Sequence, residues 1–359
     1  MRRQCYRLEA GSRDRLTPTT ETLAAPAAGE IQVTVRAIGL NFADVFSVWG
    51  LYSATPEGAF VPGLEFSGEV VALGAGVETH AVGDEVYGVT RFGAYATALN
   101  IDARYAFPLP KNWQHAEAAA YPVQALTAYY GLRSLGNVKP GHTVLVHSAA
   151  GGVGVWAGRI CRHHGAMAVG TVGREEKVAF AKTQGYEEVV VRGRTRALKG
   201  LLWEAGRLVR GETVIRPEDF ARERRVMIPQ YDLVMEPTGG RVLADSFALL
   251  RPEGRMIVYG SAHFASPAAK PNKLRLLYKY LRRPRLDPQA MIAENKGVLA
   301  FNLIWLYEQT EKMTALLREL DALELGRPHV GGRFGFGDLP AAVAALQGGG
   351  TVGKVVVEV

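Results

Sequence analysis

Short apolar runs alternate with stretches of helical spacing throughout the second half of the chain. Val144 to His147 is one such run, and its β-branched and aliphatic residues are typical of a buried parallel strand. Comparable runs predict six strands in all, at 143–148, 166–172, 188–192, 231–236, 255–260 and 297–303. Strands that alternate with helices in this way predict a doubly wound α/β sheet.

The first third of the chain has a different pattern. From Ile31 to Ile38 apolar and polar residues alternate, which predicts a half-exposed antiparallel strand. Glu65–Leu73 and Glu85–Val89 predict further strands, and the glycines between them indicate a small, irregular β-barrel. A helix or a turn is expected over 41–49, and a helix over 116–128.

The C-terminal end returns to β character at 351–359, after an expected helix at 339–346. We therefore predict that the sheet domain is inserted into the barrel domain. The expected bounds are 1–124 and 304–359 for the barrel domain and 125–303 for the sheet domain.

A turn of small residues follows the strand at 143–148 and precedes an expected helix at 155–164. Strand, tight glycine turn and helix form the context in which a G-x-G-x-x-G pattern binds a dinucleotide, because the pyrophosphate lies against the backbone and the helix N-terminus. Ala149 replaces the first glycine here, so a glycine turn of another α/β protein is the alternative. The expected contacts are Ala150, Gly151, Gly152, Val153 and Gly154.

The end of the next expected strand bears on which nucleotide is preferred. Proteins that bind NAD usually place an acidic residue there, whereas this chain has Gly173 and Arg174, with Lys177 one helical turn later. Arginine and lysine suit the 2′-phosphate of NADP. The residues therefore predict NADPH rather than NADH.

Composition is that of an ordinary globular enzyme. The 359 residues suit two domains, and they are 48% hydrophobic and 21% charged. The two cysteines, Cys5 and Cys161, cannot build a disulfide framework or a zinc ribbon. With no apolar signal segment at the start and no run of 18 apolar residues, we expect a cytoplasmic protein.

The net charge of +7 is concentrated in two basic insertions, 193–230 and 264–287. The second has no acidic residue before Asp287 and interleaves its cations with Leu and Tyr, so a basic amphipathic helix resting weakly on an anionic membrane is one interpretation. A solvated helix face beside the cofactor, or a dimer edge, is the other. Neither insertion carries a motif that reads nucleic acid, and no nucleic-acid partner is expected.

Several short motifs occur in a characteristic order. They are Gly39-Leu-Asn-Phe-Ala-Asp44, Gly50-Leu-Tyr52, Pro62-Gly-Leu-Glu-Phe-Ser-Gly68, Thr127-Ala-Tyr129, the glycine turn and Val352-Gly-Lys354. Through them the chain resembles the medium-chain dehydrogenase/reductase superfamily, in its zinc-independent quinone oxidoreductase branch. Phe264–Phe301 is most similar to the vesicle amine transport protein-like group. The resemblance spans nearly the whole chain except about 193–230.

This resemblance implies a GroES-like β-barrel domain split around a Rossmann domain, with NADPH in the cleft and commonly a homodimer. Zinc-dependent members carry a cysteine near Asn41 and a histidine before Glu65, but this chain has Asn41 and Leu64 there. The eight histidines show no metal-ligand spacing with carboxylate support. No metal is expected.

The resemblance also places Tyr52, Asn41 and Asp44 at the cleft as catalytic candidates. Tyr52 would hydrogen-bond a carbonyl oxygen or deliver a proton, unless it only packs on the barrel. Asn41 suits a ribose hydroxyl or a substrate carbonyl, or a turn. Asp44 would orient Asn41 or cap a helix.

Further cofactor contacts are expected around the cleft. Thr127 and Lys354 come from the family motifs, Lys354 being expected at the cofactor phosphates or else as a surface charge. Arg192 stands where relatives often have Tyr, and it would meet adenine and the 2′-phosphate or open the 193–230 insertion. The remaining candidates lie at or after carboxyl ends of strands, where doubly wound sheets bind ligands: Gly239, Gly260, Ser261 and Asn302.

Two functions follow from these expectations. The first is hydride transfer from NADPH to a small-molecule quinone or α,β-unsaturated carbonyl. The second is a reductase-fold protein that acts mainly by associating with membrane or lipid.

Overall fold

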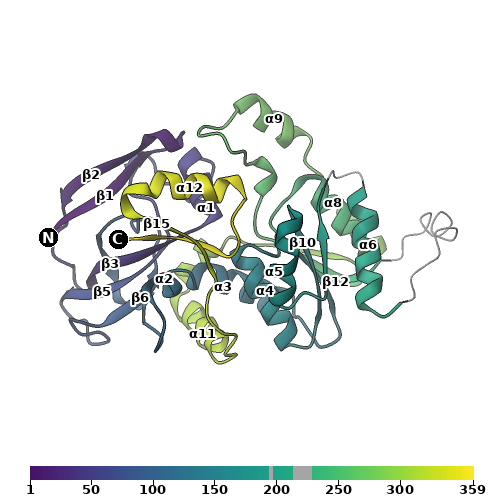
Figure 1. Cartoon of the computed structure of the whole chain (residues 1–359), viewed down its shortest axis with the longest axis horizontal. Coiled ribbons are helices and arrows are strands. Elements are labelled where there is room, and N and C mark those ends of the chain that lie inside the picture. Colours follow the sequence, from purple (N-terminus) through teal and green to yellow (C-terminus); the bar gives the residue numbers. More distant parts are fainter. Residues whose placement is uncertain (194–196, 213–228) are drawn as a thin grey trace.

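The computed structural model describes residues 1–193, 197–212 and 229–359. Figure 1 shows two parts side by side, a barrel part with strands β1, β2, β3, β5 and β6 and a sheet part with strands β10 and β12. Both termini lie in the barrel part. Residues 194–196 and 213–228 of the basic insertion 193–230 fall outside the described residues.

The second part is a six-stranded parallel sheet with the order β11-β10-β9-β12-β13-β14. All six predicted strands are confirmed within a few residues. The chain order reverses between β9 and β12, which is the switch point where such sheets bind ligands. The strands are β9 (Thr143–His147), β10 (Met167–Val172), β11 (Glu188–Val191), β12 (Tyr231–Glu236), β13 (Leu250–Val258) and β14 (Gly297–Ala300).

Helices cover both faces of this sheet. On one face, side chains of α3 and α4 pack into the cluster that contains Val144 and Val146, and on the other, α6 and α8 pack around Leu145. The alternation explains why β9 is apolar throughout, since each of its faces is buried. The elements are α3 (Pro122–Tyr129), a π-helical turn (Tyr130–Leu135), α4 (Gly152–His163), η4 (Glu175–Lys177), α5 (Val178–Thr183), α6 (Leu198–Val209) and α8 (Gly240–Ala248).

The barrel sheet has the order β15-β16-β3-β5-β6-β8, and β7 also pairs with β3. The C-terminal strand β16 lies antiparallel to β3, so the end of the chain completes the sheet formed by its beginning. A barrel interrupted by a doubly wound sheet is the predicted fold class, which is confirmed. The strands are β3 (Glu30–Leu40), β5 (Glu65–Leu73), β6 (Glu85–Val89), β7 (Ala98–Asp102), β8 (Ala106–Pro108), β15 (Val330–Gly335) and β16 (Lys354–Glu358).

Strand β3 is less exposed than its alternating pattern predicts. Gln32, on the polar side of the pattern, is buried, and its Nε2 donates to the carbonyl of Ala24 (2.9 Å) and to Oδ1 of Asn100 (3.0 Å). Because β3 pairs with β5, β7 and β16, only Arg36 of its polar residues is well exposed.

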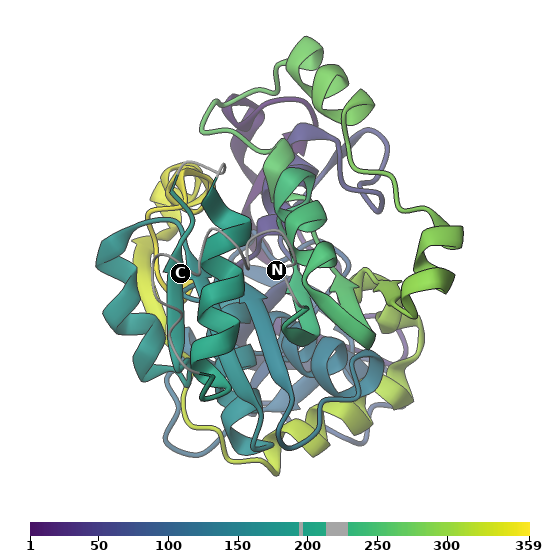
Figure 2. The ribbon, with the colours of Figure 1, turned by 90° about the vertical axis from the view of Figure 1, so that its right-hand side faces the viewer.

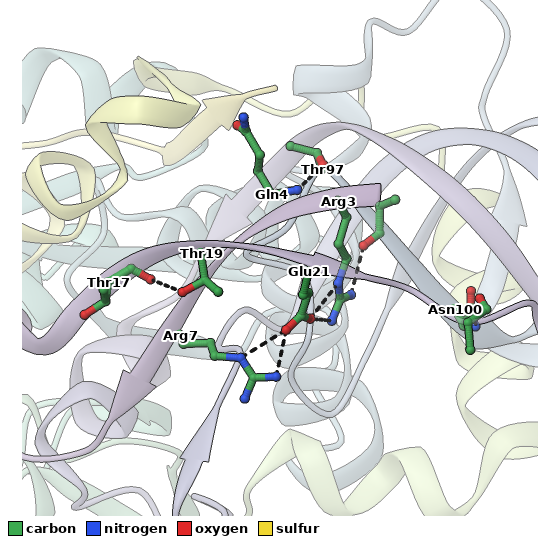
Figure 3. Close-up of polar contacts among 10 residues, drawn as sticks. Arg3, Gln4, Arg7, Thr17, Thr19, Glu21, Thr97 and Asn100 are labelled. Atoms are coloured by element: carbon green, nitrogen blue, oxygen red, sulfur yellow. Dashed lines mark hydrogen bonds and ion pairs between the residues drawn. The ribbon is translucent and has the colours of Figure 1, made fainter. Parts of the chain in front are cut away.

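A small third sheet, β2-β1-β4, packs beside the barrel. Its strands are β1 (Arg2–Glu9), β2 (Leu16–Thr22) and β4 (Ala59–Phe60). In Figure 3 the Glu21 carboxylate lies between Arg3 and Arg7 of the neighbouring strand, at 2.6 Å and 2.7 Å from their guanidinium nitrogens. This carboxylate therefore ties β2 to β1.

The remaining helices belong to the barrel part or to the junction. The helix predicted over 116–128 is divided, because Pro122 begins a new helix at its first position. The elements are α1 (Phe42–Trp49), α2 (His115–Ala118), α11 (Thr310–Asp321), α12 (Leu339–Gly348) and the 3₁₀ turns η1 (Arg13–Arg15), η2 (Ala103–Tyr105), η7 (Leu303–Glu308) and η8 (Phe336–Asp338).

The basic insertion 264–287 crosses from the sheet part to the barrel part. The carbonyl of Ala269 accepts from Nε1 of Trp49 (3.0 Å) and from the backbone N–H of Arg13 (2.9 Å). Beyond this crossing, α9 stands at the upper edge of the molecule in both views (Figures 1 and 2). The elements are η6 (Ala262–Phe264), α9 (Lys273–Leu281) and α10 (Pro288–Glu294).

Among the described residues, none of the helices combines the length and the hydropathy needed to cross a bilayer.

Candidate functional site: a nucleotide cleft at the switch point

The glycine turn lies at the carboxyl end of β9 and leads into α4. Gly151 is the N-cap residue of α4, so the first N–H groups of this helix open at the turn. A Cβ atom at Gly154 would lie 2.5 Å from the carbonyl oxygens of Ser148 and Ala149, which explains the third glycine of the pattern. Ser148 itself has a φ of 61°, an uncommon left-handed conformation for serine. The turn thus offers a preformed anion-binding backbone.

Arg192 lies beside this turn, at the end of β11. Its guanidinium donates to Oγ1 of Thr238 (3.1 Å) and to Oγ of Ser148 (3.4 Å), and burial lowers its pKa. A Cβ atom at Gly173 would lie 4.0 Å from Arg192, so the end of β10 and this guanidinium face each other. The Arg174 side chain is 57% exposed, and its nearest carboxylate, Glu176, is 3.5 Å away. Arg174 and Arg192 therefore follow the ends of the neighbouring parallel strands β10 and β11, on the side expected for the adenosine.

Lys177 has a different environment from that expected. It is buried, and its Nζ donates to the carbonyl oxygens of Gly349 (2.7 Å) and Thr351 (2.6 Å). Two of its three ammonium protons therefore hold the loop before β16 against the sheet part. Lys177 joins the two parts of the chain, and only one donor remains for a phosphate.

The loops after β12 and β13 are tied together on the other side of the switch point. The N–H of Ala262 donates to the carbonyl of Pro237 (2.9 Å), and the N–H of His263 donates to that of Thr238 (2.8 Å). Gly239 has a φ of 79°, and a side chain there would collide with the His263 ring. A Cβ atom at Gly260 would lie 2.8 Å from the carbonyl oxygen of Pro237, so the two loops also meet closely at this glycine.

Glu236 and His147 form a buried polar pair next to these loops, and the sequence did not predict it. Oε1 of Glu236 accepts from the N–H of Gly239 at 2.7 Å and from that of Thr238. Burial raises the pKa of Glu236 to about 7 and lowers the pKa of His147 to about 3. His147 lies between Ser246 (2.8 Å) and Thr171 (3.0 Å), so it is a neutral core histidine beneath the cleft.

Tyr52 and Asn302 are brought together from positions 250 residues apart. The Tyr52 hydroxyl donates to Oδ1 of Asn302 at 2.8 Å, and Nδ2 of Asn302 is 3.3 Å from Oγ of Ser53. Burial raises the pKa of Tyr52 to about 12, so the phenol stays protonated at neutral pH. Tyr52 is partly buried, with its ring edge against Phe92.

Lys354 is not a surface charge, and its ammonium group is not free at the glycine turn. The side chain is 1% exposed, and Nζ donates to Oδ1 of Asn41 (2.7 Å) and to Oε1 of Glu65 inside the barrel. The backbone beside it does meet the turn, since the N–H of Gly353 donates to the carbonyl of Ala150 (2.7 Å). The expected phosphate contact from Lys354 thus has no geometric support here.

Asn41 and Asp44 share this buried cluster. Nδ2 of Asn41 donates to Oε1 of Glu65 (2.6 Å), and the backbone N–H of Asn41 donates to Oδ2 of Asp44 (2.7 Å) at the start of α1. Burial raises the pKa of Asp44 to about 7, against the opposing effects of the Asn41 N–H and Lys354. Both side chains are buried, Asn41 at 4% and Asp44 at 0% exposure, and their catalytic roles stay a prediction.

Glu65 links this buried cluster to helix α3. Its Oε2 accepts from the N–H of Val123 at the start of α3 (3.0 Å), and Oγ1 of Thr127 donates to the carbonyl of Val123 (2.6 Å). Glu65 stands inside one of the family motifs, yet sequence alone could not show which residues share its carboxylate. Thr127 is buried on α3, close to the junction of the two parts.

Within the described ranges, the structure has no group of three or more His, Cys, Asp or Glu side chains that could hold a metal ion. Asn41 and Leu64, the positions compared with zinc ligands, are both buried.

Comparison with known proteins agrees with this geometry. Residues 27–111 match the alcohol dehydrogenase GroES-like domain family, and residues 212–357 match the family described as zinc-binding dehydrogenase. The chain is 31% identical over 335 residues to the human synaptic vesicle membrane protein VAT-1 homolog, covering 92% of this chain and 79% of that protein.

Two solved structures are similar over almost their full lengths. Mycobacterial Rv1454c complexed with NADPH has a TM-score of 0.82 and 27% identity, covering 99% of this chain and 100% of that chain. Escherichia coli quinone oxidoreductase complexed with NADPH has a TM-score of 0.81 and 26% identity, covering 100% of both chains. The chain therefore belongs to the medium-chain dehydrogenase/reductase superfamily, as the order of its motifs predicts, and it has VAT-1 homologues among its relatives and the fold of the quinone oxidoreductases.

Proposed function

We propose that this protein is an NADPH-dependent oxidoreductase that reduces a quinone or an α,β-unsaturated carbonyl compound. The observation that carries the proposal is the glycine turn at the switch point, with Arg174 and Arg192 at its adenosine side. Guanidinium groups bind phosphate in a planar, two-pronged geometry. The NADPH complexes of the two similar quinone oxidoreductase-type structures support the same cofactor.

Bound NADPH would supply the hydride, and the protein's residues would hold the acceptor and exclude water. Tyr52 is the polar group best placed for the acceptor, because it is protonated and its hydroxyl meets Asn302, just after β14, at 2.8 Å. A substrate carbonyl would replace Asn302 as the acceptor of the Tyr52 proton. Until a substrate binds, the hydrogen bond to Asn302 fixes the orientation of the Tyr52 hydroxyl. This arrangement stabilises negative charge as it develops on the carbonyl oxygen.

The test is a screen of NADPH oxidation over quinones, enones and enoyl thioesters, with NADH in parallel. We expect turnover of at least one class with NADPH. In a Tyr52→Phe variant, kcat/KM should fall roughly tenfold or more, as expected for loss of one donor to a developing oxyanion. Asn302→Ala should change kcat less than Tyr52→Phe. Unchanged kcat/KM in Tyr52→Phe would remove Tyr52 from the mechanism.

A second candidate function is association with an anionic membrane, and the surface of α9 favours it. Leu274, Leu277, Tyr278 and Leu281 follow helical spacing, yet they are 54 to 81% exposed. Such a stripe is unusual on a soluble protein. The surrounding cations are Lys270, Lys273, Arg275, Lys279, Arg282, Arg283 and Arg285. An apolar stripe flanked by cations fits the interface of an anionic bilayer.

Flotation with vesicles tests this candidate. We expect binding to phosphatidylserine-containing vesicles at low salt, loss of binding at high salt, and loss in a Leu274→Ser/Leu277→Ser variant. A control with two leucines exchanged elsewhere on the surface, Leu201→Ser/Leu208→Ser, should still bind. Absence of flotation at low salt would exclude the membrane as the partner of α9. Dimers that form without lipid and depend on α9 would show instead that this helix belongs to the interface of the predicted homodimer.

A further inference from the structure

A buried amide beside the glycine turn has an unsatisfied oxygen. Gln124 lies in the first turn of α3 and is 8% exposed, and its Oε1 has no hydrogen-bond partner among the described residues. Buried side-chain oxygens almost always have a donor, because an unpaired one loses its contacts with water without replacement. The Gln124 oxygen therefore requires an explanation.

The position of this amide suggests one. An ideal Cβ atom built on Gly152 would overlap the Gln124 amide, so the side chain lies directly against the first residue of α4. Gly152 is thus required to be glycine for a second reason besides the approach of a pyrophosphate. The amide stands at the N-terminus of a helix of 12 residues, where an anion is favoured.

The direction of the remaining cofactor follows from the sheet. The adenosine side of the turn is over β10 and β11, where Gly173, Arg174 and Arg192 lie, whereas α3 approaches from the barrel side. Thr127 is one helical turn further along α3 than Gln124. Side chains three residues apart share a helix face. Gln124 is therefore on the side where the part of a bound nucleotide beyond the pyrophosphate would lie.

We propose that Gln124 is a further cofactor-positioning residue, whose amide oxygen accepts a hydrogen bond from a ribose hydroxyl on the nicotinamide side of bound NADPH. The pyrophosphate has no donor, whereas a ribose hydroxyl does. This inference rests on the proposed NADPH binding and assigns one residue within it. In the free protein the oxygen is left without a donor, and the cofactor supplies one.

The experiment uses the full chain and the variant Gln124→Met, which keeps the length of the side chain and removes its hydrogen-bonding groups. Binding of NADPH is measured by calorimetry, alongside 2′-phospho-ADP, which lacks the nicotinamide riboside. The expected result is a roughly five- to tenfold weaker affinity for NADPH, the effect of one hydrogen bond. Affinity for 2′-phospho-ADP should not change, and the Tm of the free variant should equal or exceed that of the wild type.

The control is Gln289→Met, the same exchange at an exposed glutamine, and it should leave both affinities unchanged. Equal NADPH affinity in Gln124→Met and wild type would overturn the inference while leaving the proposed function intact. A lower Tm of the free variant, or an equal loss for both ligands, would also overturn it, because Gln124 would then support the turn itself. If wild-type protein binds no NADPH, the proposed function and this inference both fail.

Discussion

The ammonium group of Lys354 is enclosed in the barrel, where its charge is balanced by Glu65 and its protons are shared with Asn41. Burial lowers the pKa of Lys354, and the neighbouring carboxylate of Glu65 opposes that effect. Asn41 and Lys354 belong to two separate motifs, 313 positions apart, and no local pattern predicts that they meet. The sequence therefore indicates that these residues matter, whereas it does not predict which residues they contact.

Removing one charge from this cluster should be costly. We expect Lys354→Met to lower the free energy of unfolding by about 3 kcal/mol, because it leaves a buried carboxylate without its cation. The double variant Glu65→Gln/Lys354→Met should lose less than the sum of the two single changes. Denaturant unfolding of all four proteins measures this, and strict additivity would show that the two groups act independently.

At the scale of elements, buried strands were the most predictable feature. Apolar runs such as Val144–His147 have only one stable position, between helices on both faces. The division of the 116–128 helix at Pro122 and the burial of Gln32 were not predicted. The first depends on how the chain turns from barrel to sheet, and the second on how many strands pair with β3.

The Glu21 carboxylate offers a test at this scale. Hydrogen bonds from Arg7 and Arg3 lower its pKa, so its contribution to stability is present above the ordinary glutamate pKa and is lost as the pH falls through the folded value. We expect Glu21→Gln to cost about 1 kcal/mol at pH 7. The difference from wild type should shrink below about pH 4. A difference that stays constant from pH 7 to pH 3 would contradict the pairing with arginine.

At the scale of the whole molecule, contacts between distant segments hold the barrel part and the sheet part together. Tyr52 meets Asn302, Lys177 holds the carbonyls of Gly349 and Thr351, and Trp49 holds Ala269. The sequence predicted the two parts and their order, since the β character returns at the C-terminus. Lys177 is predicted as a phosphate ligand, but two of its donors hold the loop before β16. A cation at the end of a strand gives the same local sequence pattern in both cases.

A calorimetric comparison of the affinities for NADPH and NADH tests the cofactor assignment most directly. NADPH should bind at least about tenfold more tightly than NADH, as expected for guanidinium contacts to one extra phosphate. Arg174→Gln should remove most of that preference and leave NADH affinity unchanged. Arg36→Gln, a similarly exposed arginine of the barrel, should preserve it. Equal affinities in the wild type, or an undiminished preference in Arg174→Gln, would show that these guanidinium groups do not bind the 2′-phosphate.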